Sequence, residues 1–143
     1  MKTRKKLEYT LFIAWATALT ATLGSLYFSE ILGYIPCNLC WYQRIFMYPM
    51  VILFGVALIR KETTILHYAA PLAFFGSLLS AYHYFTQKVP FFQEIAPSCG
   101  QVPCTGQYIN WLGFITIPFL ALIAFLIIIV ACIYMLKLEK EMN

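Results

Sequence analysis

The chain has 143 residues, of which 62% are hydrophobic and only 11% are charged, and its formal net charge is +4. A soluble domain keeps roughly a quarter of its residues charged. This composition, with a mean hydropathy of +0.75, therefore excludes an ordinary water-soluble protein and indicates an integral membrane protein. The basic residues stand near the ends of apolar segments and form no basic face, so we expect a lipid bilayer and no nucleic acid as partner.

Four segments are long and apolar enough to cross a bilayer, which takes about 20 helical residues. They cover about residues 9–29, 41–59, 65–85 and 111–136. The first segment follows MKTRKK, which is similar to the start of a signal peptide. Its apolar run is longer than that of a signal peptide and no clear cleavage site follows, so we expect a retained helix. The sequence predicts one all-α domain, residues 1–143, built as a four-transmembrane-helix bundle with connections at 30–40 and 86–110.

Small residues and prolines add local detail to these helices. Ala14 and Ala18 lie four residues apart in the first segment, and Gly76 lies in the third. Small residues let membrane helices approach closely, so we expect them at helix–helix contacts. Pro49 and Pro118 stand in the second and fourth segments and predict a bend in each.

Basic residues are distributed unevenly over the ends and connections of these segments. Residues 2–6 contain four, residues 60–61 contain two and residues 137–140 contain two, whereas connections 30–40 and 86–110 contain only Lys88. By the positive-inside rule, both termini and the middle connection are cytoplasmic. Connections 30–40 and 86–110 are then expected on the outer side of the membrane.

Four of the five cysteines form two close pairs in these outer connections, where disulfides form and persist. Cys37 and Cys40 make a Cys-x-x-Cys motif after Pro36, a residue that suits the first position of a helix. The unpaired amide groups and the helix dipole at such a position favour a thiolate, so the motif predicts redox-active thiols. A structural disulfide and half of a metal site remain alternatives.

The second pair lies in the stretch CGQVPC, in which Cys99 and Cys104 close a very short loop. Cross-linking so short a loop stabilises a fold by only about 2 kcal/mol in the chain-entropy treatment. An exposed disulfide there suits exchange with another protein, although four cysteines in two close pairs also suit a tetrahedral zinc site. The fifth cysteine, Cys132, stands in an apolar run and is interpreted as a small buried residue.

Arg44 and His83 are the polar residues that we expect beside the first pair. Arg44 follows Cys40 by four residues and shares its helix face one turn deeper. An arginine inside a membrane segment indicates function by default, and the alternative is that it reaches to the outer surface. His83 near the end of the third segment is predicted at the same depth, whereas His67 lies at the opposite end.

No haem, flavin or iron–sulfur ligation pattern is visible in the sequence. Electrons that reach Cys40 would therefore leave to a lipid-soluble acceptor, for which a quinone is suitable. Arg44 would stabilise the charge that develops on its oxygen. The chain is thus predicted to bind a quinone and no metal.

The stretch PCNLCWYQR at the start of the second of four helices, with a cysteine pair in the second outer loop, closely resembles the DsbB family of thiol:quinone oxidoreductases. The chain looks most like the short, four-cysteine, BdbC-like members, and LGSLYFSE and GQYINWLGFITIPFLALIAF extend the resemblance over nearly its whole length. The resemblance implies a disulfide-generating enzyme of the bacterial cell membrane. It would reoxidise an extracytoplasmic DsbA-like thioredoxin-fold thiol oxidase and pass the electrons to menaquinone or ubiquinone, which sustains disulfide formation in exported proteins.

The resemblance also implies a role for each cysteine. Cys99 would be attacked by the reduced partner, and the released Cys104 would then attack Cys37. Cys40, freed as a thiolate, would donate to the quinone, and Arg44 would support that charge. The redox pairs implied are Cys37–Cys40 and Cys99–Cys104, and the second pair is spaced much more closely than in long-looped members.

Two further residues follow from the resemblance with less detail. The match around YHYFTQ implies that His83 lies near the quinone. Gln43 stands where better-known members have an acidic residue, and no catalytic role is assigned to it.

Two other classes of protein compete with the enzyme: a non-enzymatic four-helix membrane protein with structural disulfides, and a four-cysteine metal site. A vitamin-K-epoxide-reductase-like enzyme would carry its Cys-x-x-Cys at the end of a late helix.

Overall fold

The computed structural model describes residues 2–95, 103, 105 and 109–142. This part of the chain is helical, without a strand, and a single isolated bridge pairs Trp111 with Ile115. The helices in chain order are α1 (Lys2–Leu26), η1 (Tyr27–Ile31), α2 (Asn38–Arg60), α3 (Leu66–Lys88), α4 (Pro90–Ile95) and α5 (Ile117–Met142). The predicted all-α class is confirmed.

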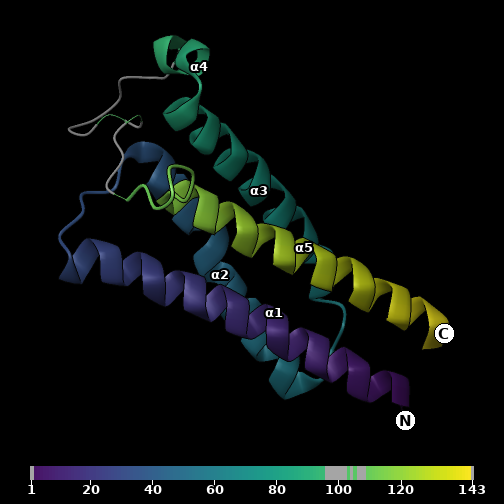
Figure 1. Ribbon diagram of the computed structural model, residues 1–143. Helices are drawn as coiled ribbons and strands as arrows, with labels where there is room; N and C mark the ends of the chain where they lie inside the picture. The colour runs from purple at the N-terminus through teal and green to yellow at the C-terminus, as the bar shows by residue number, and fades with distance from the viewer. Residues whose placement is uncertain (1, 96–102, 104, 106–108, 143) are drawn as a thin grey trace.

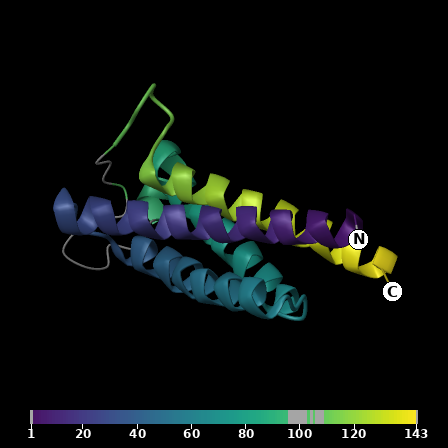
Figure 2. The same ribbon diagram turned by 90° about the horizontal axis from the view of Figure 1, so that it is seen from below.

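The four long helices pack against one another in the pairs α1–α2, α2–α3, α3–α5 and α1–α5. Figures 1 and 2 show both chain ends and the turn between α2 and α3 at one end of the molecule. The start of α2 and the short helix α4 lie at the opposite end. The residues of the Cys-x-x-Cys motif are therefore far from both termini.

Three helical segments are long and apolar enough to cross a membrane: Lys2–Ile31, Asn38–Arg60 and Ile117–Met142. The third predicted span forms helix α3, but α3 does not reach the same hydropathy. The reason lies in polar side chains that α3 buries inside the protein. They are Ser77, Ser80, His83, Thr86 and Gln87.

The start of the last long helix differs from the sequence-based expectation. The fourth helix was expected from residue 111, but α5 begins at Ile117, after a turn in which Leu112 and Gly113 have positive φ. Pro118 then lies in the first turn of α5, where a proline has no helix hydrogen bond to lose. The bend predicted at Pro118 is therefore wrong. Pro49 does lie inside α2.

Helix one also differs at both ends. It was expected over residues 9–29, but α1 begins at Lys2 and continues into the π-helix η1. A π-helix bonds each N–H to the carbonyl five residues earlier and so contains a wider turn. The Leu32 amide, for example, donates to the Tyr27 carbonyl at 3.2 Å.

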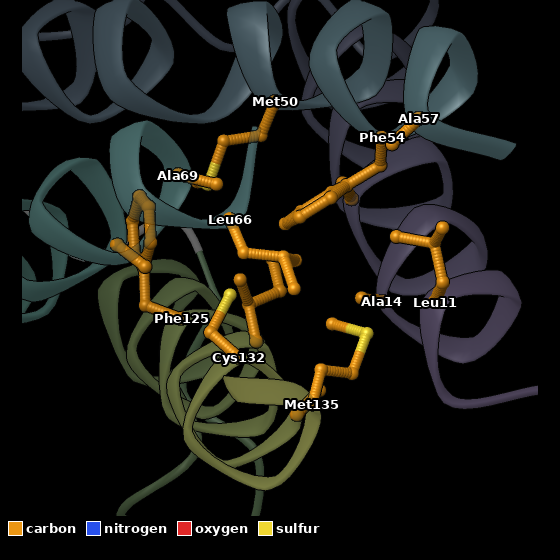
Figure 3. Packing of buried hydrophobic residues seen from close by; sticks show 14 of the residues in the cluster. Leu11, Ala14, Met50, Phe54, Ala57, Leu66, Ala69, Phe125, Cys132 and Met135 are labelled. Atoms are coloured by element: carbon orange, nitrogen blue, oxygen red, sulfur yellow. The ribbon is translucent and has the colours of Figure 1, made fainter. Parts of the chain in front are cut away.

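Buried apolar side chains from all four long helices meet in one core, to which α2 contributes Met50, α3 Leu66 and α5 Phe125 (Figure 3). Ala14 and Ala18 are fully buried there, as expected of small residues at helix contacts. Cys132 is fully buried in the same core, which confirms its interpretation as a packing residue. Large apolar side chains also cover the outside of the helices, such as Ile52 and Val130, which suits a lipid environment.

Candidate active site

Cys37 and Cys40 lie where α2 begins. Cys37 is the N-cap residue, with an extended backbone, and Cys40 lies in the first helical turn. The two cysteines are not joined by a disulfide, and their sulfur atoms are 3.5 Å apart. A disulfide bond requires about 2 Å, so the pair is a dithiol that closes with a small movement. Pro36 precedes the cap instead of occupying the first helical position.

His83 from α3 contacts the first of these cysteines. Its Nε2 is 3.6 Å from Cys37 Sγ, and its Nδ1 is 3.0 Å from the side-chain nitrogen of Gln43. All three side chains are buried, and His83 is only 1% exposed. With the amide nitrogen placed toward Nδ1, Gln43 donates a hydrogen bond there, and the ring proton lies on Nε2, facing the sulfur.

Gln43 is the residue of this site to which sequence reasoning gave no role. The available signal was its position three residues after Cys40 in an otherwise apolar helix. A buried amide requires hydrogen-bond partners, and the structure supplies His83 from a neighbouring helix. Sequence spacing did not indicate that partner, because the two residues lie 40 positions apart.

The pKa of the Cys37 thiol is raised to about 11. The hydrogen bond with Cys40 is the largest cause, burial adds to it, and the hydrogen bond with His83 acts in the opposite direction. Cys37 also makes no side-chain cap to the helix amides. The thiolate expected at this helix start is therefore not on Cys37, which holds its proton near neutral pH.

Arg44 lies one turn below Cys40, as predicted from its spacing. One guanidinium nitrogen donates to the backbone carbonyl of Ser25 in α1 at 3.2 Å. The guanidinium also lies over the ring of Trp41, 5.1 Å from its centroid, which is a cation–π geometry. Tyr48 contacts the same residue of α1, because its hydroxyl donates a hydrogen bond to the hydroxyl of Ser25 at 3.4 Å. These contacts hold the guanidinium between α1 and α2.

A largely apolar cavity of about 640 Å³ lies beside these residues. It is lined by α1, η1, α2, α5 and residues 34–36, and Cys40, Gln43 and Arg44 belong to its wall. Pockets for small ligands have this size and this mixture of apolar lining with a few polar groups. Cys37 and His83 are not among the lining residues, so the two sulfurs of the motif face different surroundings.

The two cysteines of the motif and His83 form the one group of possible metal ligands in the described part of the chain. One ligand atom from each of Cys37, Cys40 and His83 lies within 4.8 Å of the others. Thiolate and imidazole are the ligands that zinc prefers. The arrangement can therefore either form a disulfide or hold a metal ion.

The remaining predicted residues divide into two groups. Cys99 and Cys104 lie outside the described residues, so their pairing and their contact with the first pair stay predictions. His67 is exposed at the start of α3, which agrees with its interpretation as a solvated or interfacial residue.

Comparisons with known proteins identify the family of this chain. The family described as "Disulfide bond formation protein DsbB" matches residues 7–135. The chain is 54% identical to the "Probable disulfide formation protein C 1" of Bacillus cereus, over 96% of this chain and 99% of that protein. It is 56% identical to the "Disulfide bond formation protein C" of Bacillus subtilis, over 92% and 94% of the two chains.

A more distant relative is the "Probable disulfide formation protein" of Coxiella burnetii, at 46% identity over 89% of this chain and 87% of that protein. No solved structure matches the chain. The family match and the near full-length relatives agree with one another. The chain therefore belongs to the DsbB family of disulfide bond formation proteins.

Proposed function

We propose that this protein is a thiol:quinone oxidoreductase of the bacterial cell membrane. It reoxidises an extracytoplasmic DsbA-like thioredoxin-fold thiol oxidase and passes the electrons to a membrane quinone, menaquinone or ubiquinone. The observation that carries the proposal is that Cys40 belongs both to the dithiol and to the wall of an apolar cavity that also contains Arg44. Membership of a disulfide-forming family supports the same reaction.

The proposed enzyme crosses the membrane four times and has both termini in the cytoplasm. Support for α3 as a span comes from the direction of its side chains. Its buried polar residues face the protein, whereas large apolar residues face outward, among them Phe74, Phe75 and Leu78. A helix that hides its polar groups in this way is compatible with lipid even though its mean hydropathy is low.

The exchange half of the reaction begins at the second cysteine pair. The thiolate of Cys104 attacks the sulfur of Cys37, which forms the Cys104–Cys37 bond and breaks the Cys37–Cys40 bond. Cys40 leaves as a thiolate on the cavity side. The Nε2–H of His83 faces Cys37 and stabilises negative charge on that sulfur in the later step in which Cys37 is itself released.

The electron-release half takes place at the cavity. A bound quinone supplies an acceptor for two electrons and two protons. The cavity wall would hold its ring by apolar contact, while Arg44 directs positive charge to a reduced oxygen and Cys40 presents its sulfur. Gln43 connects the cavity with the histidine beside Cys37, because it lines the cavity and its side chain contacts His83.

A turnover assay tests this function directly. The purified protein is mixed with a reduced thioredoxin-fold dithiol protein and a quinone, and quinone absorbance and free thiols are followed together. We expect one quinone to be reduced for each dithiol oxidised, with loss of turnover in Cys40→Ser and full activity in Cys132→Ser. Thiol oxidation that does not depend on the quinone would exclude the proposed reaction.

A further inference from the structure

We propose that the reduced Cys37–Cys40 pair, together with His83, is a binding site for a thiophilic divalent cation of the Zn²⁺ type. We further propose that the bound ion holds the protein in its dithiol form. Binding of the ion follows from the site alone. Only its inhibitory consequence rests on the proposed function.

The spacing of the ligand atoms fits a tetrahedral ion. Zinc–sulfur bonds of about 2.3 Å and zinc–nitrogen bonds of about 2.0–2.1 Å place neighbouring ligand atoms about 3.6–3.8 Å apart at tetrahedral angles. Cys37 Sγ lies 3.5 Å from Cys40 Sγ and 3.6 Å from His83 Nε2. Two of the three separations therefore match an ion-bound geometry without a change in the backbone. The larger mismatch, about 0.3 Å between the two sulfurs, is within the reach of side-chain rotation.

Gln43 supplies the outer contact that metal-binding histidines usually have. A histidine that binds a metal through one ring nitrogen donates its other N–H to a fixed acceptor. Gln43 is 3.0 Å from Nδ1 and is only 6% exposed, so it already stands at that position. When Nε2 binds an ion, the proton moves to Nδ1, and the amide of Gln43 turns its oxygen toward that proton.

The site is also open to an incoming ion. Cys37 and His83 are buried, but Cys40 is partly exposed, and the group lies at the end of the molecule where α2 begins (Figure 1). Three protein ligands leave a fourth position for water, as in zinc sites that are not closed by a fourth side chain. A small hydrated cation can therefore reach the sulfurs without unfolding of the helix start.

Binding depends on the oxidation state of the pair. A Zn²⁺ ion binds two thiolates and releases the thiol protons, and no electron is transferred. The Cys37–Cys40 disulfide has no thiolate to offer, so the oxidised protein has no such site. The lone pairs that bind the ion are those that the sulfurs need to close the disulfide and release electrons. The ion therefore blocks reoxidation until a chelator removes it.

Cobalt and zinc titrations of the full chain test the site. The variant Cys99→Ser/Cys104→Ser/Cys132→Ser leaves one cysteine pair and removes any four-cysteine site. In its reduced form we expect one Co²⁺ per chain, with the absorption of tetrahedral cobalt and a sulfur-to-cobalt charge-transfer band, and displacement by Zn²⁺. The same variant with an oxidised pair should bind none.

Substitutions of Gln43 distinguish a site in which His83 also binds the ion from binding by the two thiols alone. Gln43→Leu removes the contact with Nδ1 and should weaken Co²⁺ binding by about 10–100-fold. Gln43→Glu still accepts from Nδ1–H and should bind at least as tightly as the parent. Gln93→Leu on the exposed face of α4 is the matched control and should change nothing. Equal affinities for Gln43→Leu, Gln43→Glu and Gln93→Leu would overturn the site, as would absence of the cobalt spectrum when thiol counting confirms two free thiols.

The consequence for turnover is measured separately. Zn²⁺ added to the reduced protein should stop quinone-dependent thiol oxidation, and a chelator should restore it. Zinc binding without a loss of turnover would overturn the inhibitory part of the proposal. A protein that binds cobalt as expected but never reduces a quinone would support the metal site and exclude the proposed function.

Discussion

Cys37 and Cys40 are separated by two residues but have different surroundings. Cys37 is buried against His83, whereas Cys40 is partly exposed and lines the cavity that contains Arg44. In the proposed exchange, the sulfur beside His83 is the disulfide sulfur that the incoming thiolate attacks. A sulfur on the wall of an apolar cavity suits release of electrons into the lipid phase. In the proposed reaction the two steps therefore take place at different atoms of one motif.

The reactivity of Cys37 should depend steeply on pH. Because its pKa is raised to about 11, the thiolate fraction is small near pH 7 and grows about tenfold for each pH unit up to that pKa. Alkylation of the reduced protein, followed by mass spectrometry of the Cys37 peptide, measures this profile. Cys40→Ala removes the largest cause of the shift and should move the profile to lower pH. A plateau near the ordinary thiol pKa in the unmodified chain would contradict the assignment.

Arg44→Ala should impair the quinone step and spare exchange. A hydrogen bond to a charged group contributes about 1.5–3 kcal/mol, so the apparent Michaelis constant for the quinone should rise by about tenfold or more. Thiol exchange with the partner, measured without quinone, should be nearly unchanged. Arg44→Lys keeps the charge but loses the planar guanidinium group. Its apparent Michaelis constant for the quinone should lie between that of the parent chain and that of Arg44→Ala. Arg60→Ala, at the other end of α2, is the control, and an equal loss in both steps would mark Arg44 as structural.

Among the helices, α3 has the most unusual distribution of side chains. It turns its polar residues inward and its aromatic residues outward, the reverse of a helix on a soluble protein. Its close approach to α5 depends on Gly76, because a Cβ there would lie 2.5 and 2.8 Å from Cζ and Cδ1 of Phe125. Phe125 is fully buried, so its ring has little room to move. The same helix carries His83 to Cys37, and its packing therefore also positions the site.

Gly76→Ala should destabilise the protein by about 1–3 kcal/mol, the usual cost of overpacking a core. Thermal unfolding in detergent would show this as a lower midpoint. Gly24→Ala is the matched control, because a Cβ at Gly24 meets nothing within 4 Å. Gly76→Ala combined with Phe125→Leu should recover part of the loss. An unchanged midpoint in Gly76→Ala would show that α3 and α5 separate more easily than their packing indicates.

At the scale of the whole molecule, the reactive groups lie at one end and most of the basic residues lie at the other, with Arg44 and Lys88 as the exceptions. The end that holds both termini also holds Lys61, which forms an exposed ion pair with Glu8 at 3.4 Å, and Thr63, which donates a hydrogen bond to Glu139. Figure 1 shows α4 and the start of α2 at the other end. In the proposed topology, which follows the positive-inside rule, the first end lies in the cytoplasm.

This orientation can be tested by labelling in intact cells. In a chain whose five cysteines are replaced by serine, Glu62→Cys and Glu94→Cys place one exposed thiol at each end. A membrane-impermeant maleimide should label Glu94→Cys from outside and label Glu62→Cys only after the cells are opened. The opposite pattern would reverse the proposed topology.

Sequence patterns predicted the features that depend on residues close together along the chain. Apolar length located the four long helices, and the spacing of Cys40 and Arg44 located two groups on one helix face. The contact of His83 with Cys37 spans 46 positions, and the cavity requires walls from α1, η1, α2 and α5. Such features arise only when the helices pack. The late start of α5 followed from the turn around Leu112 and Gly113, where apolar composition had indicated a longer helix.

The π-helix η1 has a consequence for how the chain tolerates change. Its wider turn adds one residue to the helical repeat, which sets the direction in which Phe28 and Ser29 face the cavity. Phe28 also stacks on Tyr34, and its carbonyl accepts a bond from the Tyr34 amide. Deleting one residue between 27 and 31 would restore an ordinary helix and rotate the following residues by about 100°. The size of the cavity is thus tied to the length of this segment as well as to its side chains.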